Sequence, residues 1–254
     1  MDPLPKSVRH ALAVAASAVM MLSGPVGVAA AALPESLPVA TITPGAGAPV
    51  GVGMPVTVTF SQPVVDRARA ERTIEFSSPK MTKAPAGTFA WLADNKVEFT
   101  PTTYWPAHSS IKVSVGGFKQ DFETAAATMG VASISAHTFT VSIDGQVVKT
   151  MPASMGKPKH PTPVGSFTAM SKENPVVMDS RTIGIPLSDP EGYKLTVYYA
   201  VRVTSGGVYV HSAPWSVAQQ GNSNVSHGCI NLSPDNASWY YNQVRIGDPI
   251  IINS

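Results

Sequence analysis

The chain has 254 residues, enough for one large domain or two modest ones. Hydrophobic residues make up 44% of it, sufficient for a folded core, and its formal net charge is only +2. A protein that binds nucleic acid through phosphates needs clustered basic residues, and this sequence has no run of Lys or Arg. We therefore expect no nucleic-acid partner.

The first 32 residues have the pattern of an export signal. Basic residues precede an apolar stretch over 11–22, and small residues rich in Ala follow. These are the three parts of a secretory signal peptide. The stretch is also marginally long enough to anchor in a membrane, although Gly24 and Pro25 interrupt it. We predict a signal peptide or membrane anchor over 1–32, and an exported protein of the periplasm or cell wall that is either released or membrane-anchored.

The next segment predicts a small β domain. Residues 33–50 are rich in Pro, Gly and Ala, which indicates an extended linker entering a first strand at 39–43. Short runs of alternating apolar and polar residues follow, separated by turn residues, and this pattern is typical of half-buried strands. We predict an immunoglobulin-like β-sandwich over 33–123 that serves as a spacer or binding module. Its further strands are expected at 55–60, 72–77, 87–92, 96–100 and 110–115.

A second β-rich region covers 124–254. Residues 138–148 predict two strands joined by an Asp-Gly turn. A helix is expected only at 234–243, with Ser233 or Asp235 as its N-cap. The predicted fold class is therefore mostly β, with a second β-sandwich domain that carries one short helix. Its further strands are expected at 194–203, 207–211 and 249–253.

The chain contains a single cysteine, Cys229. Exported proteins usually have cysteines in pairs, because their compartment permits disulfides. A lone thiol in such a protein is either a buried, inert side chain or a reactive group. The cysteine count does not separate these two interpretations, so the neighbouring residues must decide.

The residues around Cys229 favour a chemical role. A cysteine attacks as its thiolate, and a free thiol with a pKa of about 8.5 is mostly protonated at neutral pH. The imidazole of His211 or of His227 can take that proton and deliver it to a leaving group. Gly228 removes side-chain bulk beside the nucleophile, so that backbone amides can turn toward an oxyanion. The pattern predicts an acyl-transfer site, with either histidine as its base.

These residues also resemble a known family. His211 followed by Ser-His-Gly-Cys-Ile-Asn over 226–231 resembles the catalytic signature of the L,D-transpeptidases, and residues 162–167 resemble their second recurrent motif. The resemblance covers about 125–252. The order of signal, one immunoglobulin-like domain and this region is similar to mycobacterial L,D-transpeptidases with a single such module. The resemblance implies that 124–254 is an L,D-transpeptidase catalytic β-sandwich domain.

The resemblance implies a role for each residue near the thiol. Cys229 would be the nucleophile and His211 the general base. The backbone carbonyl of Ser212 would orient His211. The amides of Gly228 and Cys229, together with Tyr193, would form the oxyanion hole.

The resemblance further implies a substrate pocket beside the nucleophile. His227 and Asn231 would shape the site around the thiol. Met178 and Tyr193 would lie on a hairpin lid over the substrate, and Trp215 would line the pocket. The residues expected to bind substrate are Tyr193, Met178, Trp215, Asn231 and Ser226.

The reaction of the family cross-links peptidoglycan. Its donor is a tetrapeptide stem whose third residue is a diamino acid and whose fourth is D-Ala. The cysteine attacks the carbonyl of the third residue, D-Ala leaves, and the side-chain amine of an acceptor stem then forms a 3→3 cross-link. The implied partners are donor and acceptor stem peptides, with β-lactams of the carbapenem class as inhibitors and no cofactor.

Three alternatives to the transferase stay open on the residues alone. Hydrolysis of the same acyl-enzyme would make the chain an L,D-carboxypeptidase or amidase. A non-catalytic wall-binding module would contain His211 as an ordinary strand-end residue. A zinc site built from Cys229, His227, His211 and His160 has a spacing that fits zinc proteins poorly, so we expect no metal.

Overall fold

The structure is a computed structural model that describes residues 38–254. The predicted signal peptide or anchor over 1–32 lies outside these residues. Within 38–254, no helix is both long and apolar enough to cross a membrane. The described chain is mostly β, as the sequence predicts.

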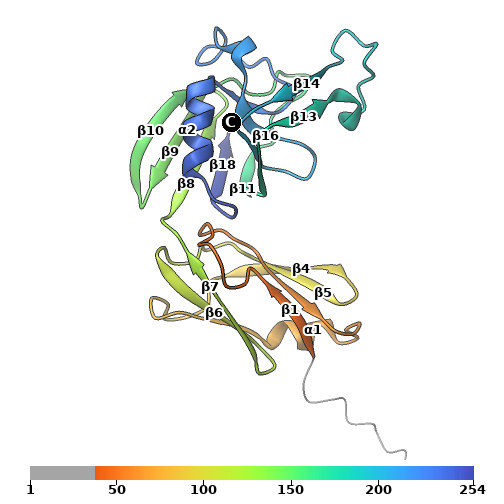
Figure 1. The fold of residues 1–254 in the computed structure, drawn as a ribbon, viewed down its shortest axis with the longest axis vertical. Helices are drawn as coiled ribbons and strands as arrows, with labels where there is room; N and C mark the ends of the chain where they lie inside the picture. The colour runs from red at the N-terminus through yellow and green to blue at the C-terminus, as the bar shows by residue number, and fades with distance from the viewer. Residues whose placement is uncertain (1–37) are drawn as a thin grey trace, which may run out of the picture. The chain divides into compact units, whose positions relative to one another are not determined.

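Alternating side chains build the first domain. In β2 (Val56–Phe60) every second residue is buried, and β6 (Ser109–Val115) has the same alternation. Because successive side chains of a strand point to opposite faces, each of these strands turns one face to a core. The strands form two antiparallel sheets, with the orders β1-β2-β5-β4 and β3-β6-β7 (Figure 1). The other strands are β1 (Val39–Thr43), β3 (Ile74–Ser77), β4 (Gly87–Ala93), β5 (Lys96–Pro101) and β7 (Phe118–Thr124).

Aromatic rings fill the core between these sheets. Trp105 packs against Phe76, with ring centroids 5.0 Å apart, and against Phe122, with centroids 5.7 Å apart. Its indole N–H donates to the carbonyl of Met54 at 2.8 Å, so the buried ring leaves no polar atom unsatisfied. The expected β-sandwich therefore has a packed core of its own.

Two elements of this domain differ from the expectation. The helix α1 (Arg67–Arg72) has only six residues, too few to show a helical period, and its start is marked by the Asp66 carboxylate, which accepts from the Arg69 amide at 2.9 Å. Because α1 includes Arg72, the strand expected from residue 72 begins only at Ile74. The strand β7 lies where the sequence predicts the end of the domain, and it pairs along its whole length with β6.

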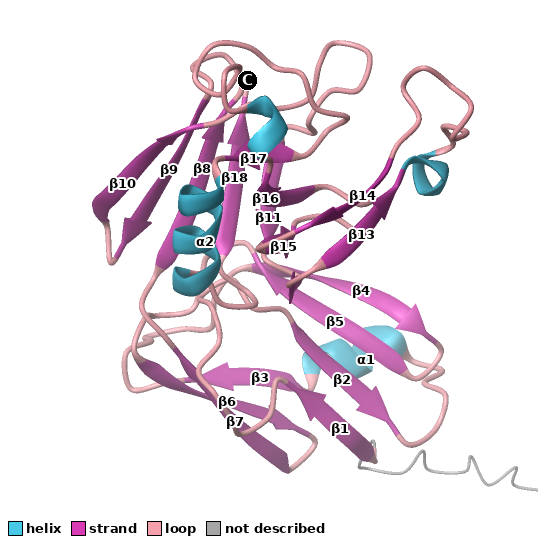
Figure 2. Cartoon of the chain, turned by 45° about the horizontal axis from the view of Figure 1, so that its top comes forward, coloured by secondary structure: helices cyan, strands magenta, loops and turns pink. Residues whose placement is uncertain are grey.

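The second domain contains two larger sheets and a hairpin. The sheets have the orders β10-β9-β8-β18-β11 and β12-β15-β16-β17, and β13 pairs with β14 (Figure 2). The last strand, β18, pairs in parallel with β8, the first strand of the domain. The bounds are β8 (Thr128–Ser133), β9 (Thr138–Ile143), β10 (Gln146–Pro152), β11 (Gly165–Thr168), β12 (Ser171–Glu173), β13 (Val176–Asp179), β14 (Lys194–Val197), β15 (Ala200–Arg202), β16 (Tyr209–Ser212), β17 (Ile230–Leu232) and β18 (Pro249–Asn253).

The helix α2 (Pro234–Gln243) has the bounds that the sequence predicts. Ser233 is its N-cap, and the Ser233 hydroxyl accepts from the Asn236 amide. The helix packs against β15 and β16, and its buried Tyr240 meets Phe139 of β9 edge to face at 4.8 Å. The helix therefore contacts strands of both larger sheets. Two short 3-10 helices, η1 (Ser180–Ile183) and η2 (Pro214–Ser216), complete the domain.

We predict that shortening Leu232 destabilises the second domain. This side chain of β17 is fully buried, so Leu232→Ala removes apolar contacts and leaves a cavity. The expected loss in free energy of unfolding is about 2–5 kcal/mol, measured by denaturant or thermal unfolding. Leu187→Ala is the matched control, because Leu187 is 46% exposed and its loss should change stability by less than about 0.5 kcal/mol. Equal losses in the two variants would contradict the packing described for β17.

Candidate active site

A tight turn before β17 holds Cys229. The Ser226 hydroxyl donates to the carbonyl of Cys229 at 2.7 Å and accepts from the Gly228 amide at 3.1 Å. Gly228 has a φ of 117°, a conformation that favours glycine because other residues have a Cβ that clashes there. The backbone of the turn is therefore closed by one serine side chain and one glycine. The Gly228 amide is engaged in this turn, so an oxyanion would compete with the Ser226 hydroxyl for it.

His211 lies on β16, which pairs in parallel with β17. The register sets His211 opposite Asn231, two residues after Cys229. The Nδ1 atom of His211 lies 2.8 Å from the Ser212 carbonyl oxygen. Because a carbonyl oxygen can only accept, Nδ1 carries the proton, and Nε2 of the neutral ring holds a free electron pair. The backbone of Ser212 thus fixes the tautomer that a general base needs.

Both reacting groups are neutral in the resting site. Burial lowers the pKa of His211 to about 4, and burial raises the pKa of the Cys229 thiol to about 11. The thiol donates to the Gly207 carbonyl, with Sγ and the oxygen 3.7 Å apart. At neutral pH the site therefore contains a thiol and an imidazole rather than a thiolate and an imidazolium. A thiol in this state would have to lose its proton at the moment of attack in order to act as a nucleophile.

A cavity of about 380 Å³ brings the predicted site residues together. All of the predicted residues line this cavity except Ser212 and Gly228, whose expected roles use backbone atoms. Trp215 is 56% exposed at the edge, and its ring centroid lies 6.0 Å from that of His211. The sequence offers no sign of four further lining residues. They are Leu195, Ser216, Gln219 and Val225.

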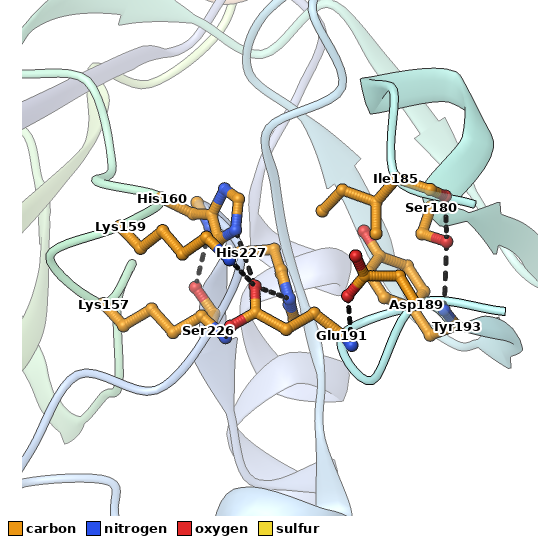
Figure 3. A network of polar contacts seen from close by, with 11 residues as sticks. Lys157, Lys159, His160, Ser180, Ile185, Asp189, Glu191, Tyr193, Ser226 and His227 are labelled. Carbon is orange, nitrogen blue, oxygen red and sulfur yellow. Dashed lines mark hydrogen bonds and ion pairs between the residues drawn. The ribbon is translucent and has the colours of Figure 1, made fainter. Parts of the chain in front are cut away.

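Met178 and Tyr193 belong to the hairpin of β13 and β14, and their expected role as a lid over the substrate stays a prediction. Met178 lies on β13 opposite Leu195, and Tyr193 directly precedes β14. The Ser180 amide donates to the Tyr193 carbonyl at 2.9 Å. The Tyr193 amide donates to the Ser180 hydroxyl at 3.0 Å (Figure 3). These two hydrogen bonds close the loop between the strands and fix the backbone of Tyr193.

Asn231 has a wall position in the cavity. It is 3% exposed, and its side-chain amide donates to the Ser216 hydroxyl at 3.1 Å. Its backbone amide donates to the carbonyl of Ser154 at 2.8 Å. These contacts give Asn231 a part in holding the cavity wall, whereas its expected contact with substrate stays a prediction.

His227 meets a polar cluster around Glu191, a residue that the sequence does not single out. The Glu191 carboxylate lies 2.8 Å from Nε2 of His160, 3.6 Å from Nε2 of His227 and 2.9 Å from Nζ of Lys157 (Figure 3). The hydrogen bonds from Lys157 and His160 lower the pKa of Glu191 to about 2. These side chains come from three separate loops, and no spacing in the sequence relates them.

Comparison with known proteins identifies both domains. A model of the bacterial Ig domain matches residues 29–117, and a model of the L,D-transpeptidase catalytic domain matches residues 127–252. The fold and the site thus define an Ig-like module joined to an L,D-transpeptidase catalytic domain. The domain limits expected from the sequence, 33–123 and 124–254, stay predictions.

Relatives match the chain over nearly its whole length. L,D-transpeptidase 1 from Mycobacterium tuberculosis (strain ATCC 25618 / H37Rv) is 57% identical over 246 residues, which cover 96% of this chain and 97% of the relative. A structure of an L,D-transpeptidase from Mycobacterium smegmatis is 64% identical with a TM-score of 0.80, and covers 85% of this chain and 99% of its own. A structure of the LD transpeptidase LdtMt1 in complex with imipenem is 60% identical with a TM-score of 0.78. The match covers 85% of this chain and 98% of the chain in that structure. The chain belongs to the L,D-transpeptidase family and is an enzyme of that family.

We predict that Cys229 is alkylated slowly at neutral pH. With its pKa raised to about 11, the thiol at pH 7 is four pH units below its midpoint, so about one molecule in ten thousand carries the thiolate. The rate constant for iodoacetamide should rise about tenfold per pH unit between pH 6 and 10. Mass spectrometry can follow the adduct without interference, because the chain has no other cysteine. A rate that is flat between pH 5 and 8 would instead indicate a preformed thiolate and imidazolium.

Proposed function

We propose that this enzyme forms 3→3 cross-links between peptidoglycan stems through an acyl-enzyme on Cys229. The observation that carries the proposal is a lone thiol in the same cavity as an imidazole whose Nδ1 is held by the Ser212 carbonyl at 2.8 Å. Both groups line the same cavity, which is open to a peptide. A thiol and a general base in one pocket are the requirements of acyl transfer.

The first half-reaction transfers the donor stem to the enzyme. Nε2 of His211 takes the proton of the thiol as Sγ of Cys229 attacks the carbonyl of the third stem residue. The tetrahedral intermediate then collapses, the bond to the D-Ala nitrogen breaks, and His211 returns the proton to that nitrogen. Neutral groups suit this sequence, because His211 begins as a base and becomes an acid only after the attack.

The second half-reaction uses an amine as the acceptor. The side-chain amine of a second stem attacks the thioester carbonyl, and His211 takes a proton from the amine. The bond from the carbonyl carbon to Sγ then breaks, and His211 returns the proton to Sγ, which restores the thiol. The amide of Cys229 and the residue Tyr193 of the lid are proposed to stabilise the oxyanion in both steps. Burial raises the pKa of Tyr193, and the negative charge that Cys229 would carry as a thiolate raises this pKa further. The Tyr193 hydroxyl therefore stays protonated and can donate a hydrogen bond.

Carbapenems are proposed to acylate the same thiol. Solved structures of relatives contain imipenem in one case and a faropenem-derived adduct in another. The second relative is 51% identical to this chain, with a TM-score of 0.78, and covers 86% of this chain and 99% of its own. A strained β-lactam carbonyl would occupy the place of the stem carbonyl beside Cys229.

Export is proposed for this chain on its amino-terminal pattern. Its substrate would lie in the cell wall, and a basic, apolar and Ala-rich start would carry the enzyme there, either released or anchored to the membrane. The first domain would act as a spacer or as a module that binds wall material.

One experiment separates the proposed transferase from a hydrolase. The enzyme is incubated with a tetrapeptide stem, and mass spectrometry reads both the products and the adduct on the protein. We expect a dimer of stems, loss of D-Ala and an acyl adduct on Cys229, whereas Cys229→Ala should keep its fold and form no dimer. Tripeptide without any dimer would instead identify an L,D-carboxypeptidase or amidase, and dimer formation by Cys229→Ala would refute the mechanism.

We predict that His211→Ala slows acylation far more than His227→Ala. Removing the base should lower the rate constant for acylation by a carbapenem by about 10²–10⁴-fold. Loss of His227 should lower it by less than about tenfold, because this ring meets Glu191, His160 and Tyr193. The decay of the carbapenem absorbance measures both rates. Equal effects would mean that the base is assigned to the wrong histidine.

A further inference from the structure

Three side chains able to bind a metal ion converge beside the turn over residues 226–229, which holds Cys229 and is called the catalytic turn below. They are His160, Glu191 and His227, and their ligand atoms all lie within 4.8 Å of one another. Figure 3 shows both imidazoles directed at one carboxylate oxygen of Glu191. Each side chain is between 20% and 26% exposed, so the cluster is partly enclosed but open to an ion from solvent.

The spacing of these atoms is close to that of a zinc site. Zinc binds His nitrogen and carboxylate oxygen at about 2.0–2.2 Å, so a tetrahedral site sets its ligand atoms about 3.3–3.6 Å apart. Oε2 of Glu191 lies 2.8 Å from Nε2 of His160 and 3.6 Å from Nε2 of His227. All three ligand atoms lie within 4.8 Å of one another, so small side-chain movements would bring them to these separations and create three ligand positions, with a fourth for water.

His227 supplies a second observation. Its Nε2 atom is buried and makes no hydrogen bond within the described residues, although the carboxylate lies just beyond hydrogen-bond distance. A buried polar atom without a partner is costly and uncommon, and a metal ion would satisfy it.

The lysines beside the cluster leave one carboxylate oxygen accessible. Lys157 holds Oε1 of Glu191 at 2.9 Å, while the imidazoles meet Oε2. Lys159 lies further from Oε2, at 3.5 Å, and 68% of its side chain is exposed, so it can turn into solvent. Lys157 would then orient the carboxylate from behind, as outer partners of metal ligands do.

We propose that His160, Glu191 and His227 bind a divalent transition metal ion such as Zn²⁺ at the edge of the active site. The site differs from the zinc set considered for the sequence, because it uses neither Cys229 nor His211 and includes a carboxylate. It departs from the expectation of no metal. Glu191 belongs to the loop of the lid and His227 to the turn of the nucleophile, so a bound ion ties the lid to the catalytic turn.

The test measures zinc binding in the full chain with Cys229→Ala, so that the thiol is not a ligand. Competition with a chromogenic zinc chelator should give one equivalent of bound Zn²⁺. Adding His160→Gln or Glu191→Gln should weaken binding at least tenfold, because each removes one of three ligands. His108→Gln is the matched control, since this histidine pairs with Asp144 elsewhere, and it should bind as tightly as the parent.

Two results would overturn the proposal. One is the absence of bound zinc at one equivalent in the parent, and the other is unchanged affinity in both His160→Gln and Glu191→Gln. Thermal unfolding of each variant shows whether it is folded. His160 and Glu191 lie on different loops, so if one variant does not fold, the other still tests the site. X-ray absorption of the zinc-loaded parent gives a readout independent of substitution, with two imidazole nitrogens expected in the shell and a shell without them contradicting the site.

Discussion

The parallel pairing of β16 with β17 is the constraint on which the active site depends. Residues 211 and 229 are far apart in sequence, yet the register of His211 with Asn231 fixes the histidine strand beside the strand that follows the nucleophile. Parallel strands need a long connection, and here that connection carries Trp215 and the catalytic turn. Because both strands are buried along their whole lengths, a shift in register would bury the wrong side chains and is strongly disfavoured.

Burial decides how the reacting pair operates. The same enclosure raises the pKa of the thiol and lowers that of the imidazole, so the resting pair is neutral. A protonated thiol is oxidised and alkylated more slowly than a thiolate, and this suits a lone cysteine in the exported protein that we propose. In the function that we propose, the nucleophile would thus stay inactive until a substrate carbonyl is beside it, and the base is already in the tautomer that activation requires.

Local patterns account for much of the fold and for the centre of the site. Period-2 alternation predicts β2 and β6, and the helix expected at 234–243 matches α2 to the residue. The sequence does not predict the helix α1, because α1 is shorter than two turns and shows no helical period. It does not predict the strand β7, because the first half of β7 is mostly exposed and shows no regular alternation of buried and exposed residues. The contact of Glu191 with His160 and His227 depends on how three loops fold against one another, and no local rule reports that.

The surroundings of the two histidines argue for their different roles. His211 is fixed through Nδ1 by a backbone carbonyl, so its other nitrogen is free to exchange a proton within the cavity. His227 instead directs Nε2 at the Glu191 carboxylate, and its ring packs at a tilt against those of His160 and Tyr193, with centroids 4.9 Å and 5.1 Å away. A ring with those neighbours is suited to coupling the lid to the turn, because any motion of Glu191 or Tyr193 changes its contacts. The histidine next to Cys229 in sequence thus contacts the loop of the β13–β14 hairpin, and the distant one is the base in the function that we propose.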